Sequence, residues 1–141
     1  MGRDVVEDGH HGHARRHDVG RVEEAATHLG DRLDRLLLEG VRALTNGCRH
    51  SVLDLGAGVG QYGHELEASC RLRWRGYDGA GDVEEYTRGY VHFADMTIPL
   101  ALPRADWVVC LEVGEHVHRQ HELMLIRNLH AHNRCGVLLS W

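Results

Sequence analysis

The sequence predicts an α/β fold in which a parallel sheet is flanked by helices. First, a short apolar run within Ser51–Gly63 ends in glycines at alternating positions, which indicates a buried strand, a tight loop and a helix start. Second, further apolar runs alternate with stretches of helical periodicity as far as Trp141. Third, residues 106–111 are almost continuously apolar, as in a strand buried on both faces. Strands that alternate with helices form parallel sheets through right-handed crossovers.

The composition is that of one soluble domain with a hydrophobic core. The chain has 141 residues, of which 43% are hydrophobic and 26% charged, and its net charge is −5 with histidine neutral. This charge excludes the generic basic surface of nucleic-acid-binding proteins, although it leaves a local basic patch open. No segment suits a membrane span or a signal peptide. Four scattered cysteines without a C-x-x-C pair favour a reduced, intracellular and cytoplasmic setting.

Two segments precede the predicted sheet. Residues 1–18 combine four histidines with arginines, which predicts a disordered polar leader; a metal-binding histidine cluster is the alternative. In residues 19–46 apolar side chains recur at helical spacing, which predicts one or two amphipathic helices that pack on the sheet or edge a ligand cleft. The remaining residues, 47–141, form the predicted ligand-binding domain.

The elements of this domain follow in a regular order. Strands are predicted at 51–55, 72–77, 90–94, 106–111 and 136–141. Helices are predicted at about 60–69, 82–87 and 119–132. In the last helix four apolar side chains are expected to face the sheet: Leu123, Leu125, Ile126 and Leu129.

The glycine loop predicts a site for a nucleotide-type ligand at the carboxyl end of the first strand. Gly56, Gly58 and Gly60 let the main chain approach a ligand closely. A G-x-G-x-x-G pattern also runs from Gly58, but its register is poor for a dinucleotide, since Gly56 is the first glycine after the strand. Asp54, in an otherwise apolar strand, is costly unless it faces a polar ligand. It would repel a pyrophosphate and hold a cationic ammonium group.

This D-x-G-x-G-x-G stretch, Asp54–Gly60, resembles the first motif of class I S-adenosylmethionine-dependent methyltransferases, which have a Rossmann-like fold. The resemblance covers residues 51–141 and implies S-adenosylmethionine as the cofactor. In that family the acid lies near the methionine ammonium. The loop, here Gly56, Ala57, Gly58 and Gly60, runs under the methionine and ribose.

Two further acids extend the predicted cofactor site. Asp78 follows the second strand, 18 positions after Gly60, and is expected to accept hydrogen bonds from both ribose hydroxyls beside the small Gly79. Capping of the next helix is the alternative. By resemblance, Asp95 would meet the adenine amino group and Met96 would pack on the ring. A loop aspartate followed by a core methionine is the alternative reading of that pair.

The sequence EVGEH after the fourth predicted strand brings Glu112, Glu115 and His116 close together in the chain. This E-x-x-E-H pattern resembles that of the ubiquinone-pathway O-methyltransferases and the small-RNA 2′-O-methyltransferases. There the same residues hold a divalent cation that polarises the accepting hydroxyl, which implies Mg²⁺ or Mn²⁺. In the alternative without a metal, the backbone of Glu112 lines the methionine pocket and the other two residues cap a helix.

We therefore predict a methyltransferase that transfers a methyl group to an unknown acceptor. The family normally adds an antiparallel pair of strands after the fifth, so the prediction is a domain truncated after strand five. The alternative is a catalytically incomplete module that binds the cofactor or a protein partner. A nicotinamide oxidoreductase is disfavoured by the glycine register and by Asp54. Residues 136–141 would form an apolar, uncharged edge, which predicts self-association through this strand.

Overall fold

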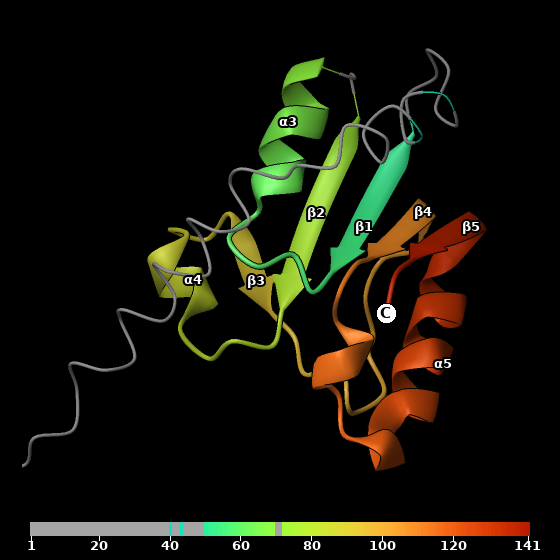
Figure 1. Cartoon of the computed structure of the whole chain (residues 1–141). Coiled ribbons are helices and arrows are strands. Elements are labelled where there is room, and N and C mark those ends of the chain that lie inside the picture. The colour runs from blue at the N-terminus through green and yellow to red at the C-terminus, as the bar shows by residue number, and fades with distance from the viewer. Residues whose placement is uncertain (1–39, 41–42, 44–49, 70–71) are drawn as a thin grey trace, which may run out of the picture. The chain divides into compact units, whose positions relative to one another are not determined.

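The computed structural model describes residues 40, 43, 50–69 and 72–141, which contain a five-stranded parallel sheet of order β3-β2-β1-β4-β5 (Figure 1). The strands are β1 (Ser51–Leu55), β2 (Arg73–Asp78), β3 (Val91–Phe93), β4 (Ala105–Cys110) and β5 (Asn133–Leu139). The α-helices are α3 (Gln61–Ser69), α4 (Val83–Tyr86) and α5 (Glu122–His132), and two 3₁₀ turns lie at Gly114–His116 and Arg119–His121. The predicted α/β fold class is confirmed.

The two amino-terminal predictions fall mostly outside the described residues. None of residues 1–18 is described, and of residues 19–46 only Gly40 and Ala43 are, both in helical conformation. The leader and the amphipathic helix therefore stay predictions. Among the described residues, no helix has the length and apolarity that crossing a membrane requires.

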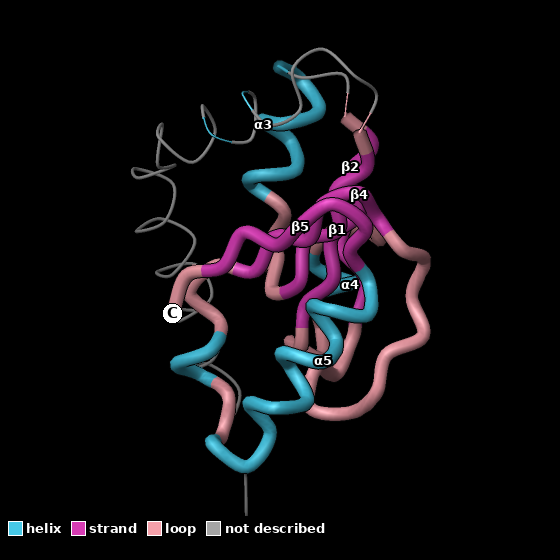
Figure 2. The backbone as a smooth tube through the Cα atoms, turned by 90° about the vertical axis from the view of Figure 1, so that its right-hand side faces the viewer, coloured by secondary structure: helices cyan, strands magenta, loops and turns pink. Residues whose placement is uncertain are grey.

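Side-chain alternation along the central strand divides the core into two clusters, one on each face of the sheet. Val52 packs with Leu66 of α3 and Val83 of α4. Leu53 packs with Leu125 and Leu129 of α5 on the other face. Figure 2 accordingly shows α3 and α5 on opposite sides of the strands. Burying each such side chain stabilises the fold by about 1.5–3 kcal/mol.

The buried stripe of α5 differs from the prediction. Leu125 and Leu129 are buried as expected, but Leu123 is 61% and Ile126 40% exposed, so the prediction was wrong for these two. The α-helix begins only at Glu122, after a 3₁₀ turn, and its inner face follows the spacing i, i+3, i+4, i+7. That face comprises Leu125, Asn128, Leu129 and His132. Two of its four residues are polar, and a pattern of apolar residues could not reveal them.

These two polar side chains hold the segment Met96–Leu102, which connects β3 to β4. Both side chains are buried, so each needs hydrogen-bond partners. The segment has no regular secondary structure, and its backbone groups supply those partners. The bonds join Asn128 Nδ2 to the carbonyls of Met96 (3.0 Å) and Ile98 (2.8 Å), Leu100 N to Asn128 Oδ1 (3.0 Å), and Leu102 N to His132 Nε2 (3.1 Å). The connection between β3 and β4 is thereby fixed to α5.

The last strand runs over Asn133–Leu139, three residues earlier than predicted at its start and two at its end. It begins early because α5 ends directly against it: Asn133 Nδ2 donates to the carbonyls of Leu129 and His130 at 3.0 Å each. Among the described residues β5 pairs only with β4, which leaves its other side without a neighbouring strand. Exposed apolar side chains continue along it, namely Val137, Leu139 and, just beyond the strand, Trp141.

We propose that the free side of β5 pairs with a second copy of the chain. The double variant Val137→Lys/Leu139→Lys is expected to weaken this association on the order of tenfold, since like charges would oppose each other across the paired strands. Light scattering over a range of protein concentrations measures the effect. Leu138 is unsuited to this test, because it packs into the core.

Leu123→Lys/Ile126→Lys is the matched control for that experiment, since it places the same two charges at exposed apolar positions of α5. It should leave the association unchanged. A wild-type chain that stays monomeric at every concentration, or an equal loss of association in the control, would show that β5 is not the contact.

Candidate cofactor site at the carboxyl edge of the sheet

The loop between β1 and α3 lies where the order of the strands reverses. The chain runs outward from β1 to β2 and β3 and then crosses back to β4 on the other side of β1. At such a point the connections that follow the two neighbouring strands run to opposite faces of the sheet and leave a crevice, which is where open α/β sheets bind ligands. Figure 1 shows the β1–α3 loop at this edge.

The three loop glycines serve different purposes. All have a positive φ, of 90° at Gly56, 55° at Gly58 and 83° at Gly60, where residues with a side chain are strained. A Cβ on Gly56 would lie 2.1 Å from the side chain of Val113, and one on Gly60 2.7 Å from the ring of Tyr90. A Cβ on Gly58 would meet nothing within 4 Å. Packing within the protein thus explains two of the glycines, and Gly58 is the one with open space for a ligand.

Asp78 is the last residue of β2 and its carboxylate spans two loops. The amide of Gly58 donates to Oδ2 at 2.8 Å, and the amide of Ala80 donates to Oδ1 at 2.9 Å. Each oxygen retains capacity for another hydrogen bond, because a carboxylate oxygen has two lone pairs. Asp78 does not cap α4; the residue at that cap is Asp82, which makes no side-chain capping bond. The backbone amides therefore fix an acceptor next to the open glycine.

Asp54 lies inside the protein, with 3% of its surface exposed. The indole Nε1 of Trp74 donates to its Oδ2 over 3.3 Å. Burial raises the pKa of this carboxyl to about 7; the Trp74 bond opposes the shift, and the negative charge of Asp78 adds to it. The indole reaches Asp54 across Gly76, where any Cβ would lie 2.2 Å from the ring. Asp54, which was predicted to face a polar ligand, thus has a polar partner within the protein, the indole of Trp74.

Glu112 follows β4 with an unusual backbone. Its φ is +54°, which is uncommon for a residue with a side chain and costs on the order of 1–3 kcal/mol. Ser140 supports this conformation twice: the Glu112 amide donates to Ser140 Oγ at 3.1 Å, and that hydroxyl donates to Glu112 Oε1 at 2.6 Å. The next residue, Val113, packs on Gly56. The bend thus brings the end of β4 against the glycine loop.

Comparison with solved structures relates this architecture to known proteins, whereas no protein-family model and no curated protein matches the sequence. A TehB-like SAM-dependent methyltransferase from Corynebacterium glutamicum is similar with a TM-score of 0.65 and 17% identity, over 84% of this chain and 70% of that one. SAM-bound CalS10, an amino pentose methyltransferase from Micromonospora echinaspora, has a TM-score of 0.64 and 17% identity, over 94% and 60%. The fold is that of the class I methyltransferases.

A third similar structure is the methyltransferase domain of bacterial CtHen1, with a TM-score of 0.59 and 19% identity, over 73% of this chain and 63% of that one. At such identities the likeness concerns the fold. The chain spans 60–70% of the length of these three structures.

Within this methyltransferase fold, Asp95 and Met96 lie just after β3. Asp95 Oδ1 accepts hydrogen bonds from the amide of Thr97 at 2.9 Å and from its hydroxyl at 2.6 Å. These bonds lower the pKa of the Asp95 carboxyl. Met96 is buried and packs with Leu53 and Leu55 in the core. The local geometry thus gives Asp95 a role in a turn and Met96 a role in packing, while their contact with adenine stays a prediction.

The residues proposed for a metal do not converge. Glu115 and His116 lie side by side in the 3₁₀ turn Gly114–His116, where successive side chains point about 120° apart. The His116 side chain is 79% exposed, and its Nε2 is 4.0 Å from Glu115 Oε1. Among the described residues, no group of three or more His, Cys, Asp and Glu side chains is arranged to hold a metal ion. Glu112, Glu115 and His116 therefore do not fit a Mg²⁺ or Mn²⁺ site in this geometry.

Three residues that shape this site were not predicted from the sequence. Trp74 bonds Asp54, Val113 packs on Gly56, and Ser140 holds Glu112. Alternation along the second strand could have placed Gly76 on the same face as Trp74, but the pairing of Gly76 with Asp54 depends on the register of the two strands. No sequence signal marked Ser140, since it lies 28 residues from its partner.

Proposed function

We propose that the chain binds S-adenosylmethionine at the carboxyl edge of the sheet and transfers its methyl group to an acceptor. The observation that carries this proposal is the pairing of open Gly58 with the Asp78 carboxylate. Structures of the same fold support it: CalS10 is described with SAM bound, and DhpI as a complex with SAH. The acceptor and its reacting atom are not part of the proposal.

Each residue at the edge has a task in binding this cofactor. The Asp78 carboxylate accepts hydrogen bonds from the ribose hydroxyls, because its two backbone donors leave lone pairs available. The loop of Gly56, Ala57, Gly58 and Gly60 presents main chain rather than side chains, and the small Gly79 leaves room beside Asp78. Asp54 in its ionised form attracts the methionine ammonium, and the backbone of Glu112 borders the same pocket.

The bound cofactor supplies an activated methyl group, so the contribution of the protein is position and alignment. Holding two reactants at the distance and angle of attack is itself a large source of rate acceleration. The proposal contains no metal-dependent step, because the residues suggested for a metal do not fit one. Asp95 and Met96 are proposed to border the adenine.

The alternative function is a module that binds the cofactor or a protein partner without transferring the methyl group. An assay of methyl transfer, rather than of cofactor binding, distinguishes this module from an enzyme. Transfer of a labelled methyl group from S-adenosylmethionine to any component of a cell extract, lost in a variant that no longer binds the cofactor, supports the enzyme. Cofactor binding without transfer supports the module.

Asp78→Ala is expected to weaken the binding of S-adenosylhomocysteine by about 1–3 kcal/mol, or roughly 5- to 150-fold in Kd. The variant removes the acceptor for the ribose and also releases the amides of Gly58 and Ala80. Isothermal titration calorimetry measures the affinity, and NAD is expected not to bind. Asp82→Ala is the matched control, since it removes an acid that makes no side-chain capping bond at α4.

Thermal melting of both variants distinguishes loss of the site from loss of the fold. An Asp78→Ala protein that melts cooperatively and binds the ligand as tightly as wild type would remove Asp78 from the proposed site.

A further inference from the structure

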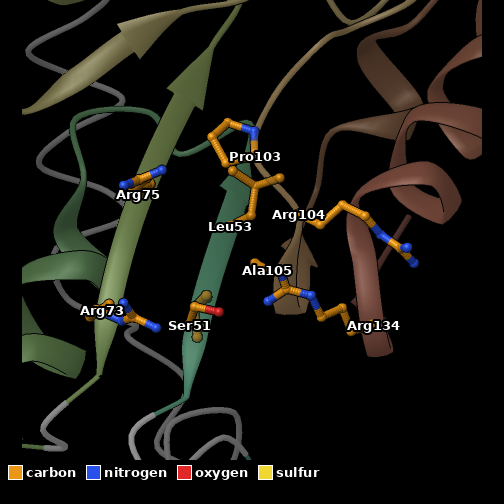
Figure 3. A pocket seen from close by; sticks show the side chains of 9 residues that line it. Ser51, Leu53, Arg73, Arg75, Pro103, Arg104, Ala105 and Arg134 are labelled. Carbon is orange, nitrogen blue, oxygen red and sulfur yellow. The ribbon is translucent and has the colours of Figure 1, made fainter.

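A cavity lies at the opposite edge of the sheet from the proposed cofactor site. It is a cavity of about 200 Å³ over the amino-terminal half of β1 and the neighbouring part of β2 (Figure 3). Ser51 and Leu53 of β1 form its floor, whereas the glycine loop follows the other end of that strand. The lining residues that carry charge are all arginines: Arg73, Arg75, Arg104 and Arg134.

The strand pattern explains why two of these arginines lie together. On β2, Trp74 packs into the cluster beneath α3 and α4, so alternation places Arg73 and Arg75 on the other face. Their neighbours on β1 are Ser51 and Leu53, respectively. Arg134, near the start of β5, approaches from the far side of the cavity, as Figure 3 shows. Two strands that are not neighbours in the sheet, β2 and β5, thus contribute cations to one cavity.

The positive charge of this cavity is only partly balanced. Arg134 Nη1 is 3.6 Å from Asp106 Oδ1. Hydrogen bonds from the amide and hydroxyl of Ser51, each 2.8 Å long, lower the pKa of the Asp106 carboxyl and keep it ionised. His50 Nδ1 lies 3.9 Å from the same carboxyl. Arg104 Nη2 donates to the neutral backbone carbonyl of Asn133 at 2.6 Å.

Within the described ranges, neither Arg73 nor Arg75 has a carboxylate partner. Among the residues that the structure describes, the guanidinium groups of Arg73 and Arg75 therefore lack an opposing carboxylate, and that of Arg104 bonds a neutral carbonyl. Repulsion between the guanidinium groups makes this clustering unfavourable. The cluster also contrasts with the chain as a whole, which carries a net charge of −5 and has no lysine. A bound anion would offset this repulsion.

We infer that the cavity binds a compact phosphate-bearing anion. Guanidinium groups form planar pairs of hydrogen bonds that match phosphate oxygens, and clustered arginines favour a group that carries more than one negative charge. A cavity of about 200 Å³ has room for one or two phosphoryl groups. The site is separate from the proposed cofactor site, because it lies at the other end of β1.

Sodium pyrophosphate is the probe for the test, used with the 141-residue chain at constant ionic strength. Calorimetry is expected to show binding to the wild type and a loss of about tenfold or more in affinity for Arg73→Gln/Arg75→Gln. Arg88→Gln/Arg127→Gln is the matched control: it removes the same charge from arginines outside the cavity and should bind like the wild type. Melting temperatures without ligand verify that both double variants fold.

The experiment has outcomes that overturn the inference. No binding of pyrophosphate to the wild type does so, and so does an equal loss of affinity in both double variants, which would mean general charge attraction. Binding of S-adenosylhomocysteine should be unchanged in Arg73→Gln/Arg75→Gln, so failure of this site is distinguishable from failure of the cofactor site. A competition experiment identifies where the bound phosphate comes from. If pyrophosphate displaces a single-stranded oligonucleotide from the same arginines, the phosphates belong to a nucleic acid. Failure of the oligonucleotide to compete would identify a free oligophosphate.

Discussion

Asp54→Asn is expected to make the folded chain more stable at neutral and alkaline pH. The folded pKa of Asp54 is about 7, above its ordinary value of 3.8, because the carboxyl is buried. The folded state therefore retains the proton that the unfolded state loses, and wild-type stability falls as pH rises from 3.8 to about 7. Across this interval the stability difference between variant and wild type should grow by up to about 4 kcal/mol and then level off.

Urea unfolding of both proteins at a series of pH values measures this difference. Asp82→Asn, at an exposed position, controls for the change in net charge. A stability difference that does not change with pH would mean that Asp54 is not held in a buried, protonated form. Asp54→Asn should also weaken binding of S-adenosylmethionine, if the carboxylate attracts the methionine ammonium as proposed. Higher stability with lower affinity is the combination expected of a group kept for function.

Asn128→Ala is expected to lower the free energy of unfolding on the order of 3 kcal/mol. The buried side chain donates to the carbonyls of Met96 and Ile98 and accepts from the amide of Leu100. Alanine leaves these three backbone groups without their partners. Chemical denaturation measures the loss, and hydrogen exchange of the Leu100 amide should become faster.

Arg127→Ala is the control for this change, because it lies next to Asn128 on the exposed face of the same helix. It should change the stability by less than about 0.5 kcal/mol. A loss below about 1 kcal/mol for Asn128→Ala would indicate that water replaces the missing amide and that the Met96–Leu102 segment does not depend on it.

The features that could be predicted from the sequence are those with local causes. Apolar runs located the strands, and β1 and the start of α3 agree with the structure within one residue. The positive φ angles of Gly56, Gly58 and Gly60 follow from a tight turn directly after a strand. Asp78 was placed at the end of the second strand, at the same edge as the loop, because parallel strands end together. These inferences need only the chain near each residue.

The features that could not be predicted depend on pairing between distant segments. The strand register decided that Asp54 lies opposite Gly76. Because Gly76 has no side chain, Trp74 can reach across it and donate a hydrogen bond to the buried Asp54 carboxyl. The rotation of α5 about its own axis decided that Asn128 is buried and Ile126 is exposed. The order of the strands in the sheet decided that Arg73 and Arg75 share a cavity with Arg134.

The sequence by itself thus determined the fold class, the glycine loop and the acid after β2. Only the tertiary structure decided which partner each buried polar group has and where the arginines gather. The physical reason is range: backbone preferences and hydrophobic periodicity act over a few residues, whereas hydrogen bonds and charge clusters join residues far apart in the chain. Asp106 and Ser51 are separated by 55 positions, yet their hydrogen bonds help to define the charge balance of the arginine cavity.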